Sequence, residues 1–169
     1  TGPVILSRSI DIYQSDNAQR IHDKLSNITA EILIDAIKGY TIGNIEPVPQ
    51  KEIGIKYANK IEKAEAEIDW EDGSKEIYNK IRAFDPFPGT FTFLHNSLIK
   101  IVSSRLGNNT HESEPGTIIE VGKKIIVACG KKTTLEIVSL QKPGKKIIST
   151  IEFLNGTKIM IGEKFGSRE

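Results

Sequence analysis

The chain of 169 residues carries 23 basic and 22 acidic residues, and its net charge of +1 excludes a strongly basic nucleic-acid binder on bulk charge alone. This length supports one sizeable domain, or a small domain with an appendage, without disulfide bonds or metals. Neither an apolar run of about 18 residues nor a signal-peptide pattern occurs. The single cysteine, Cys129, lies in the apolar run IIVAC, so we predict a soluble, cytoplasmic protein with a buried, reduced thiol.

The charge is divided unevenly along the chain. Residues 1–67 contain eight basic and ten acidic residues, whereas residues 68–169 contain 15 basic and 12 acidic residues. From Ser97 to Lys158 there are ten basic residues and five acidic ones. A partner that carries phosphate groups is therefore expected to bind the second part of the chain.

The N-terminal segment predicts a strand followed by a long amphipathic helix. The strand is VILSRSIDI, which is rich in β-branched residues, and Asp16 with Gln19 forms a capping-box-like helix start. Gly39 predicts the end of the helix. Apolar residues recur at helical spacing at Ile21, Leu25, Ile28, Ile32, Leu33, Ala36 and Ile37. A strand with a one-sided helix is half of a packing unit, so we expect residues 1–40 to be cut from a larger domain.

Residues 41–67 are predicted to link two domains. The helical periodicity fades after Tyr40, Pro47 and Pro49 follow, and the segment ends in the charged run KIEKAEAE. We expect an extended chain around the prolines and a brief helical turn near Lys63.

Residues 68–169 predict a small antiparallel barrel with one short helix. The helix is GSKEIYNKIRAF, with Ser74 as its cap, and DPFPG ends it. Trp70 and Phe87 flank this helix and are expected to anchor the core or a domain interface. The runs TFTFL, LIKIVSS, GTIIEV, KIIVACG, TLEIVSLQ, KKIIST and TKIMIG predict about six strands. Short strands separated by Gly, Pro, Asn or Lys-Lys turns are typical of an OB-like barrel.

The residues that carry chemistry are few. His22, His95 and His111 lack the spacing of a metal site, and the glycine-containing segments match neither a Walker motif nor a dinucleotide fingerprint. We therefore expect no metal and no nucleotide hydrolysis.

Lysines concentrate in the predicted turns of the barrel. They are Lys123, Lys124, Lys131, Lys132, Lys142, Lys145 and Lys146. Such lysines either solvate turns and protect strand edges or contact phosphates, and the pattern alone leaves both interpretations open. Because aromatic residues are sparse in these strands, a folded RNA bound through its backbone and shape fits better than stacked single-stranded bases.

The order of four segments resembles the C-terminal part of methionyl-tRNA formyltransferases. These segments are YANKIEKAEAEIDW, IYNKIRAFDPFPG, PGTIIEV and LEIVSLQKPGKKIISTIEFLNG. LQKPGKK followed by FLNG favours the tRNA-directed enzymes over sugar or folate formyltransferases, whose barrel needs no RNA. A free-standing OB-type RNA-binding module is a third alternative, which the N-terminal strand and helix disfavour.

The resemblance implies a mixed fold, in which an OB-like barrel follows a strand-helix remnant of a Rossmann-like α/β formyltransferase domain. Residues 1–40 would end the catalytic domain, 41–67 would form the linker and 68–169 the tRNA-binding domain. The implied co-substrate is 10-formyltetrahydrofolate, and the implied partner is initiator methionyl-tRNA, bound by a monomer without a membrane or a metal.

The resemblance also implies roles for individual residues. Thr1 and Gly2 would border the formyl-folate pocket. The catalytic Asn, His and Asp would lie outside these 169 residues, the Asp immediately before Thr1, so we expect no formyl transfer and no bound folate for this chain alone. Asn109-Thr110-His111 matches the family's Asn-x-His pattern only by chance, because ESEPG follows it. The expected tRNA contacts are Lys60, Lys131, Lys132, Lys142, Lys145 and Lys146. Arg82 is expected instead to face the last carbonyl groups of its helix and Asp85.

Overall fold

Residues 2–166 are described by the structure, a computed structural model, and the chain divides between Lys60 and Ile61 into two units. The first unit contains the long helix α1 (Ala18–Ile42). This confirms the predicted helix, but both of its ends are displaced. Asn17 rather than Asp16 caps the first turn, and the helix continues through Gly39 to a left-handed Gly43 with φ +81°.

Contacts from beyond the helix explain why Gly39 does not end it. The carbonyl oxygen of Gly39 accepts hydrogen bonds from the N–H groups of Asn44 and Ile45 at 2.8 and 3.1 Å. A Cβ atom at position 39 would lie 2.4 Å from the side chain of Ile45. The glycine therefore allows the chain to fold back over the last turn of α1.

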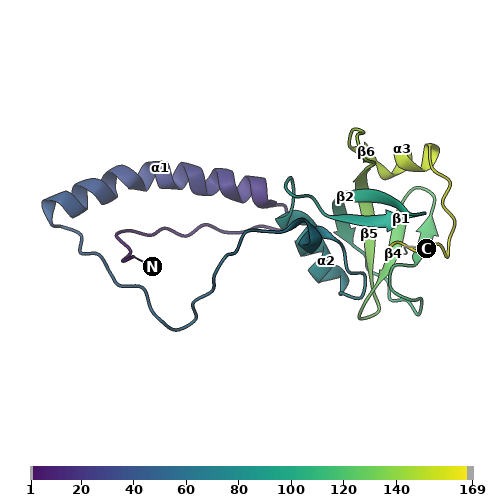
Figure 1. Ribbon diagram of the computed structural model, residues 1–169, viewed down its shortest axis with the longest axis horizontal. Helices are drawn as coiled ribbons and strands as arrows, with labels where there is room; N and C mark the ends of the chain where they lie inside the picture. Colours follow the sequence, from purple (N-terminus) through teal and green to yellow (C-terminus); the bar gives the residue numbers. More distant parts are fainter. Residues whose placement is uncertain (1, 167–169) are drawn as a thin grey trace. The chain divides into compact units, whose positions relative to one another are not determined.

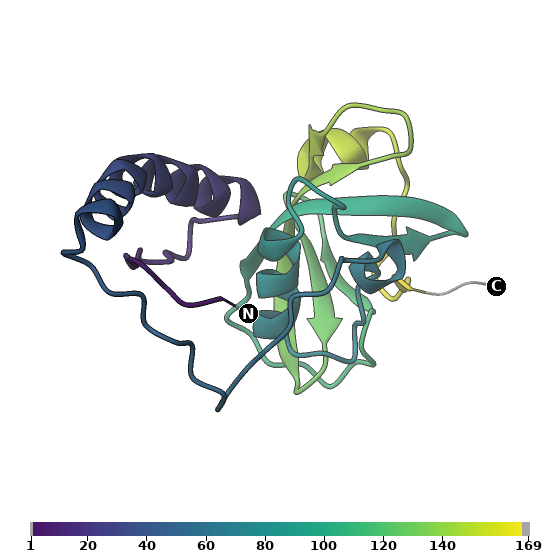
Figure 2. The same ribbon diagram turned by 60° about the vertical axis from the view of Figure 1, so that its left-hand side comes forward.

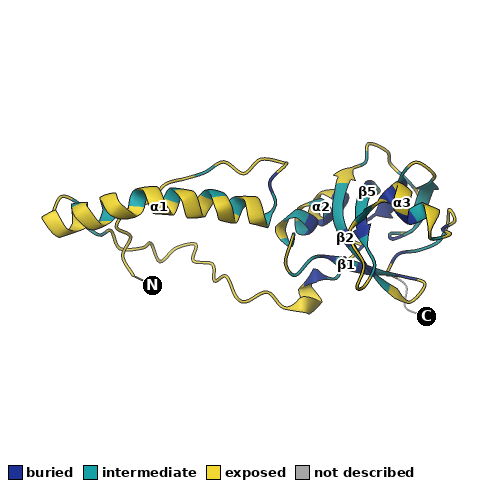
Figure 3. Cartoon of the chain, turned by 90° about the horizontal axis from the view of Figure 1, so that it is seen from above, coloured by how far each residue is buried: buried dark blue, intermediate teal, exposed yellow. Residues whose placement is uncertain are grey.

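The predicted strand VILSRSIDI is wrong for the described residues. Only Val4 pairs with another segment, through two backbone hydrogen bonds with Val48 of 2.8 and 2.9 Å. A strand is stable only as part of a ladder, and this segment has one paired residue. The helix α1 likewise buries no residue (Figure 3). Leu33 and Ile37 of its predicted apolar stripe are more than half exposed.

The second unit is an antiparallel half-barrel with short helices (Figure 1). Its sheet has the order β1-β2-β5-β4-β3, with β6 also paired to β5. The elements are η1 (Lys63–Ala66), α2 (Ser74–Ala83), β1 (Phe91–Leu94), β2 (Ser97–Leu106), β3 (Ile118–Val121), β4 (Ile125–Cys129), β5 (Thr133–Gln141), β6 (Ile148–Ser149) and α3 (Thr150–Asn155). The short helical turn near Lys63 and the six strands are confirmed.

Two predictions for the end of the barrel are wrong. KKIIST contributes only two strand residues, because Ser149 and Glu152 form a capping box that starts α3. TKIMIG is not a strand. The chain continues instead into a segment that bonds to both edge strands of the sheet, β3 and β1. The N–H of Gly162 donates to the carbonyl of Ile118 in β3 at 2.8 Å, and the N–H of Gly166 donates to the carbonyl of Phe93 in β1 at 2.9 Å.

The helix α2 packs on strands β2 and β5 (Figure 2). Ile77 and Ile81 are buried on its inner face. Its N-cap is Gly73, so the predicted cap at Ser74 is wrong. The N–H of Ser74 instead donates to the hydroxyl of Thr133 at 2.7 Å.

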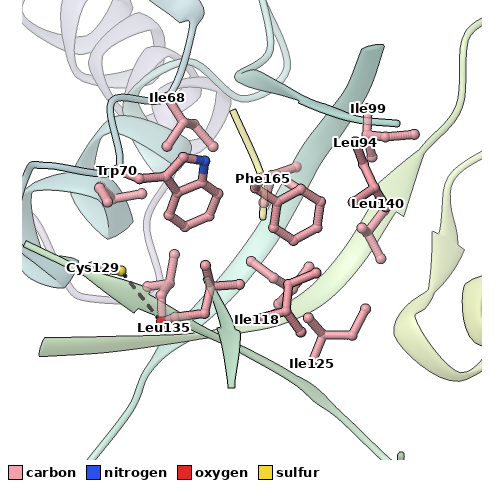
Figure 4. Close-up of a cluster of buried hydrophobic side chains, with 14 of the residues drawn as sticks. Ile68, Trp70, Leu94, Ile99, Ile118, Ile125, Cys129, Leu135, Leu140 and Phe165 are labelled. Carbon is pink, nitrogen blue, oxygen red and sulfur yellow. Dashed lines mark hydrogen bonds between the residues drawn. The ribbon is translucent and has the colours of Figure 1, made fainter. Parts of the chain in front are cut away.

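Trp70, which is 5% exposed, belongs to the buried hydrophobic core of the barrel (Figure 4). Its ring stacks on Phe165 with centroids 5.6 Å apart, and its Nε1–H donates to Thr92 Oγ1 at 3.0 Å. The core role predicted for Trp70 is confirmed. Phe87 is 75% exposed, so it does not anchor this core: it lies between Pro86 and Pro88 in a loop beyond the end of α2.

Gly130 brings the β4–β5 turn against the segment that precedes α2. Its N–H donates to the Trp70 carbonyl at 2.8 Å, and a Cβ atom at position 130 would lie 1.7 Å from the carbonyl oxygen of Glu71. No side chain fits at this contact.

We expect Gly130→Ala to lower the free energy of unfolding by about 3 kcal/mol or more, since backbone would have to move away. Gly156→Ala is the matched control, because no atom lies within 4 Å of its Cβ position, and it should change stability by less than about 1 kcal/mol. Urea unfolding measures both. Equal effects of the two substitutions would contradict the assigned contact.

Cys129 is fully buried, and burial raises the pKa of its thiol to about 12. At pH 8 about one molecule in ten thousand would carry a thiolate, which is the reactive form. The native protein should therefore resist alkylation by iodoacetamide, whereas the urea-unfolded protein should react as an ordinary cysteine. Mass spectrometry of the two reactions measures this, and rapid labelling of the folded chain would disprove it.

Candidate functional site

The lysines of the barrel that are predicted to contact tRNA form two groups at opposite ends of β5. Lys131 and Lys132 lie in the β4–β5 turn, with φ of +57° and +55°. Lys142, Lys145 and Lys146 lie in the loop between β5 and β6. The strand rise places the two ends of β5 roughly 26 Å apart, so the predicted contact residues beyond those ends do not form one patch.

Both lysines of the β4–β5 turn are paired with carboxylates. Lys131 donates to Glu76 of α2, and Lys132 donates to both carboxylate oxygens of Glu112 at 2.9 and 2.8 Å. The hydrogen bond from Lys131 lowers the pKa of Glu76, and that from Lys132 lowers the pKa of Glu112. The positive charge of this turn is therefore compensated locally.

His111 holds the backbone on both sides of the same turn. Its Nε2 lies 2.9 Å from the carbonyl oxygens of Cys129 and of Thr133. Carbonyl oxygens only accept, so we assign the proton to Nε2. Nearby, the Asn109 carbonyl accepts a hydrogen bond from Thr134 at 3.1 Å. The Asn109-Thr110-His111 segment thus fastens a loop to the start of β5.

The KPGK sequence forms a tight turn after β5. The N–H of Lys145 donates to the carbonyl of Lys142 at 3.0 Å, and Gly144 has a φ of +67°. Pro143 at the second position and a left-handed glycine at the third are the requirements of a type II turn. Gln141 closes the loop by donating to the Lys145 carbonyl at 2.7 Å.

Lys142 is held in place by neutral groups. Its Nζ donates to Thr157 Oγ1 at 2.7 Å and lies 5.1 Å from the centroid of the Phe153 ring. Within residues 2–166 no carboxylate oxygen lies within 4 Å of Lys142 Nζ. Lys145 and Lys146 are exposed, and the charge of Lys146 adds to the Ser149 hydrogen bonds that lower the pKa of Glu152. Within residues 2–166, the charge of Lys142 in this loop is therefore not paired with a carboxylate, whereas Lys146 lies near Glu152.

The remaining predicted site residues belong to the first unit. Lys60 is exposed. Gly2 lines a hollow of about 550 Å³, and its carbonyl accepts a hydrogen bond from Gln50 at 2.7 Å. Thr1 lies outside the described residues.

The described part of the chain contains no group of three or more His, Cys, Asp or Glu residues arranged to hold a metal ion. Among residues 2–166, no helix is both long and apolar enough to cross a membrane.

Residues 60–158 match the family described as formyl transferase, C-terminal domain. The chain belongs to this family. It is 38% identical over 165 residues to the methionyl-tRNA formyltransferase of Parvibaculum lavamentivorans, an alignment that covers 96% of this chain and 53% of the relative. The chain thus spans about half the length of such relatives, and the predicted resemblance to the C-terminal part of methionyl-tRNA formyltransferases is confirmed.

Two solved structures share the fold at low sequence identity. HypX from Aquifex aeolicus, in complex with tetrahydrofolic acid, has a TM-score of 0.65 and 16% identity, over 99% of this chain and 31% of that one. An N-formyltransferase from Helicobacter canadensis, in complex with folinic acid and dTDP-3-aminofucose, has a TM-score of 0.61 and 20% identity, over 81% and 50% of the two chains. The observed half-barrel with a short helix agrees with the OB-like fold predicted for this family.

Several residues around the lysines were missed by the sequence analysis. Lys142 is held by Phe153, which lies in α3, and by Thr157, which lies just after α3. The capping box of Ser149 and Glu152 is a local sequence signal for the start of this helix. Glu76 lies 55 residues from Lys131, and no local pattern connects them.

Removing one lysine of the β4–β5 turn should change the pKa of its own carboxylate partner only. Lys131→Gln should raise the pKa of Glu76 toward about 4.3, its usual value, and leave Glu112 unchanged. Lys132→Gln should raise the pKa of Glu112 and leave that of Glu76 unchanged. Carbon-detected NMR titration measures both, and Glu152, which is held by Ser149, is an internal control.

The same substitutions should affect stability in a defined pH range. A folded-state pKa below the unfolded value gives a stabilisation that is present above the unfolded pKa and is lost as the pH falls through the folded pKa. The difference in unfolding midpoint between wild type and Lys131→Gln should therefore shrink as the pH falls below the usual pKa of a glutamate, and it should vanish below the lowered pKa of Glu76. A difference that grew in acid would contradict the pairing.

Proposed function

We propose that this chain forms the tRNA-binding part of a methionyl-tRNA formyltransferase, a one-carbon transferase. The whole enzyme moves a formyl group from 10-formyltetrahydrofolate to the amino group of initiator methionyl-tRNA, for the start of translation. The observation that carries the proposal is the β5–β6 loop, where a type II turn presents Lys142, Lys145 and Lys146 without a carboxylate to neutralise Lys142. Phosphate groups are the natural partners of such a surface.

Sequence identity supports the tRNA-directed enzyme over its relatives. Three methionyl-tRNA formyltransferases that match this chain are 33–38% identical to it, whereas two solved sugar formyltransferases that match it are 20–22% identical. The barrel of a sugar or folate formyltransferase would also need no RNA contact.

The division of labour within the enzyme follows from the same resemblance. Residues 1–40 would belong to the Rossmann-like catalytic domain, where the exposed apolar stripe of α1 suits further packing. Residues 41–67 would link it to the tRNA-binding barrel of residues 68–169. We expect the enzyme to act as a monomer.

The chemistry of formyl transfer requires groups that this chain is not proposed to supply. The amino group of the methionyl ester attacks the formyl carbon, so a base must accept a proton and donors must stabilise an oxyanion. The family's Asn, His and Asp perform these roles. Thr1 and Gly2 would border the folate pocket, and we expect folate to bind the whole enzyme rather than this chain.

The two lysine groups would contact the RNA differently. Lys142, Lys145 and Lys146 can meet phosphates directly. Lys131 and Lys132 would first have to exchange a carboxylate for a phosphate, so they should contribute less. A separation of roughly 26 Å between the ends of β5 suits a folded RNA, whose backbone spans such distances. We assign Lys60 a contact with the acceptor end of the tRNA.

Replacing Lys142, Lys145 and Lys146 together by Gln should weaken tRNA binding and reduce its salt dependence. Three lost phosphate contacts would lower the slope of log affinity against log salt by about 2.7. Filter binding between about 50 and 200 mM salt measures this. The matched control replaces Lys123 and Lys124 of the β3–β4 turn by Gln, where Lys124 is already paired with Glu120.

In an enzyme that carries both parts, the same triple substitution should raise the KM for methionyl-tRNA and leave the KM for the folate unchanged. Equal effects on both constants, or an unchanged salt slope for the isolated chain, would contradict the proposed function.

A further inference from the structure

A groove of about 410 Å³ opens beside the lysine loop. Its accessible apolar lining comes from the half-buried Leu98 of β2 and the exposed Pro143 of the loop. Leu94, Ile99 and Phe153 also line it, but they are buried in the barrel. Lys142 and Lys145 lie on the side formed by the loop. The groove thus combines an apolar surface with positive charge, and its volume is within the range of about 300–1,000 Å³ that small-molecule pockets occupy.

The position of Lys142 prepares this groove for an anion. Its ammonium group has three hydrogens, and Thr157 Oγ1 accepts one of them at 2.7 Å. The Nζ atom of Lys142 also lies 5.1 Å from the centroid of the Phe153 ring. Because both contacts already restrain the lysine side chain, it loses little further rotamer freedom when an anion binds. Since no carboxylate in residues 2–166 lies within 4 Å of this group, an incoming anion displaces no salt bridge.

Polar groups at the hairpin end of the groove complete the site. His95 and Asn96 form the two-residue β1–β2 turn with φ of +48° and +59°. His95 Nε2 contacts Glu163 at 2.9 Å, which fixes the ring. Ser97 lines the groove and is exposed. The hydroxyl group of Ser97 can donate to or accept from the polar edge of a ring.

We propose that this groove binds one unpaired nucleotide of the RNA partner. Its phosphate would contact Lys142 and Lys145, and its base would lie against Leu98 and Pro143 with its polar edge toward Ser97. Unpaired bases are what folded RNA offers to protein pockets, because bases in A-form helices are out of reach. This inference rests on the proposed function, and it adds recognition of a base to contacts that are otherwise only electrostatic.

NMR spectra of the 169-residue chain, titrated to about 10 mM with cytidine or adenosine 5′-monophosphate, test the groove. The expected result is a set of shifts at Ser97, Leu98, Ile99 and Thr157. Lys142→Gln should weaken binding about tenfold, because it removes a charge-assisted hydrogen bond. Thr157→Val keeps the shape and the charge but frees Lys142, and should weaken binding about threefold. Lys124→Gln should have no effect.

Three results would overturn the inference. Inorganic phosphate that binds as tightly as the nucleotides and shifts the same residues would mean that no base is recognised. An acidic peptide that binds more tightly than the nucleotides would assign the groove to a protein partner. Shifts that avoid the groove residues would place the nucleotide elsewhere.

Binding of whole tRNA tests the proposed function separately from the groove. If mononucleotides do not bind but tRNA binds with a salt slope that depends on Lys142, Lys145 and Lys146, the inference fails and the proposed function stands. If neither binds, both fail.

Discussion

The burial of Trp70 is the constraint on which the rest of the barrel depends. Its indole N–H bonds to Thr92 of β1, its ring stacks on Phe165 in the C-terminal segment, and its carbonyl accepts the N–H of Gly130 in the β4–β5 turn. These contacts join three parts of the chain that are distant in sequence. They also fix the start of α2, and with it Glu76, which pairs with the lysine next to Gly130.

Lysines that look equivalent in the sequence differ in what they can do. Lys131 and Lys132 form ion pairs that a phosphate must replace, so the gain from a new contact is offset by the loss of an old one. Lys142 is oriented by a hydroxyl and an aromatic ring, which position its charge without neutralising it. Positioned charge is more effective in binding than mobile charge, because less side-chain entropy is lost. The β5–β6 loop is therefore the stronger candidate for first contact with a polyanion.

The sequence was informative where short-range chemistry determines structure. β-branched runs between turn residues correctly predicted β1 to β5, although the similar runs VILSRSIDI and TKIMIG form no strand, and KPGK predicted its turn. The errors came from longer-range contacts: Ile45 folds over Gly39 and prolongs α1, and Trp70 occupies the core that Phe87 does not reach. The helix α3 was missed because KKIIST resembles a strand, although Ser149 and Glu152 carry a helix signal. The lysines of the candidate site were found, but their partners were not, since ion pairs between distant segments leave no local pattern.

Strand β5 connects the packing of the core to the proposed recognition of RNA. Leu135, Ile137 and Leu140 are buried along it, and β2 and β4 bond to its two sides. A strand restrained in this way keeps its two ends at a constant separation, so the lysine groups at those ends form a preorganised pair of contact points. A flexible polyanion could reach either group alone, but simultaneous contact favours a partner whose phosphates already have this spacing. The hydrophobic core would then give the protein selectivity for the shape of a folded RNA, because it fixes the separation of the two lysine groups. Recognition of a base in the groove beside Lys142 would fix which nucleotide lies against these lysines.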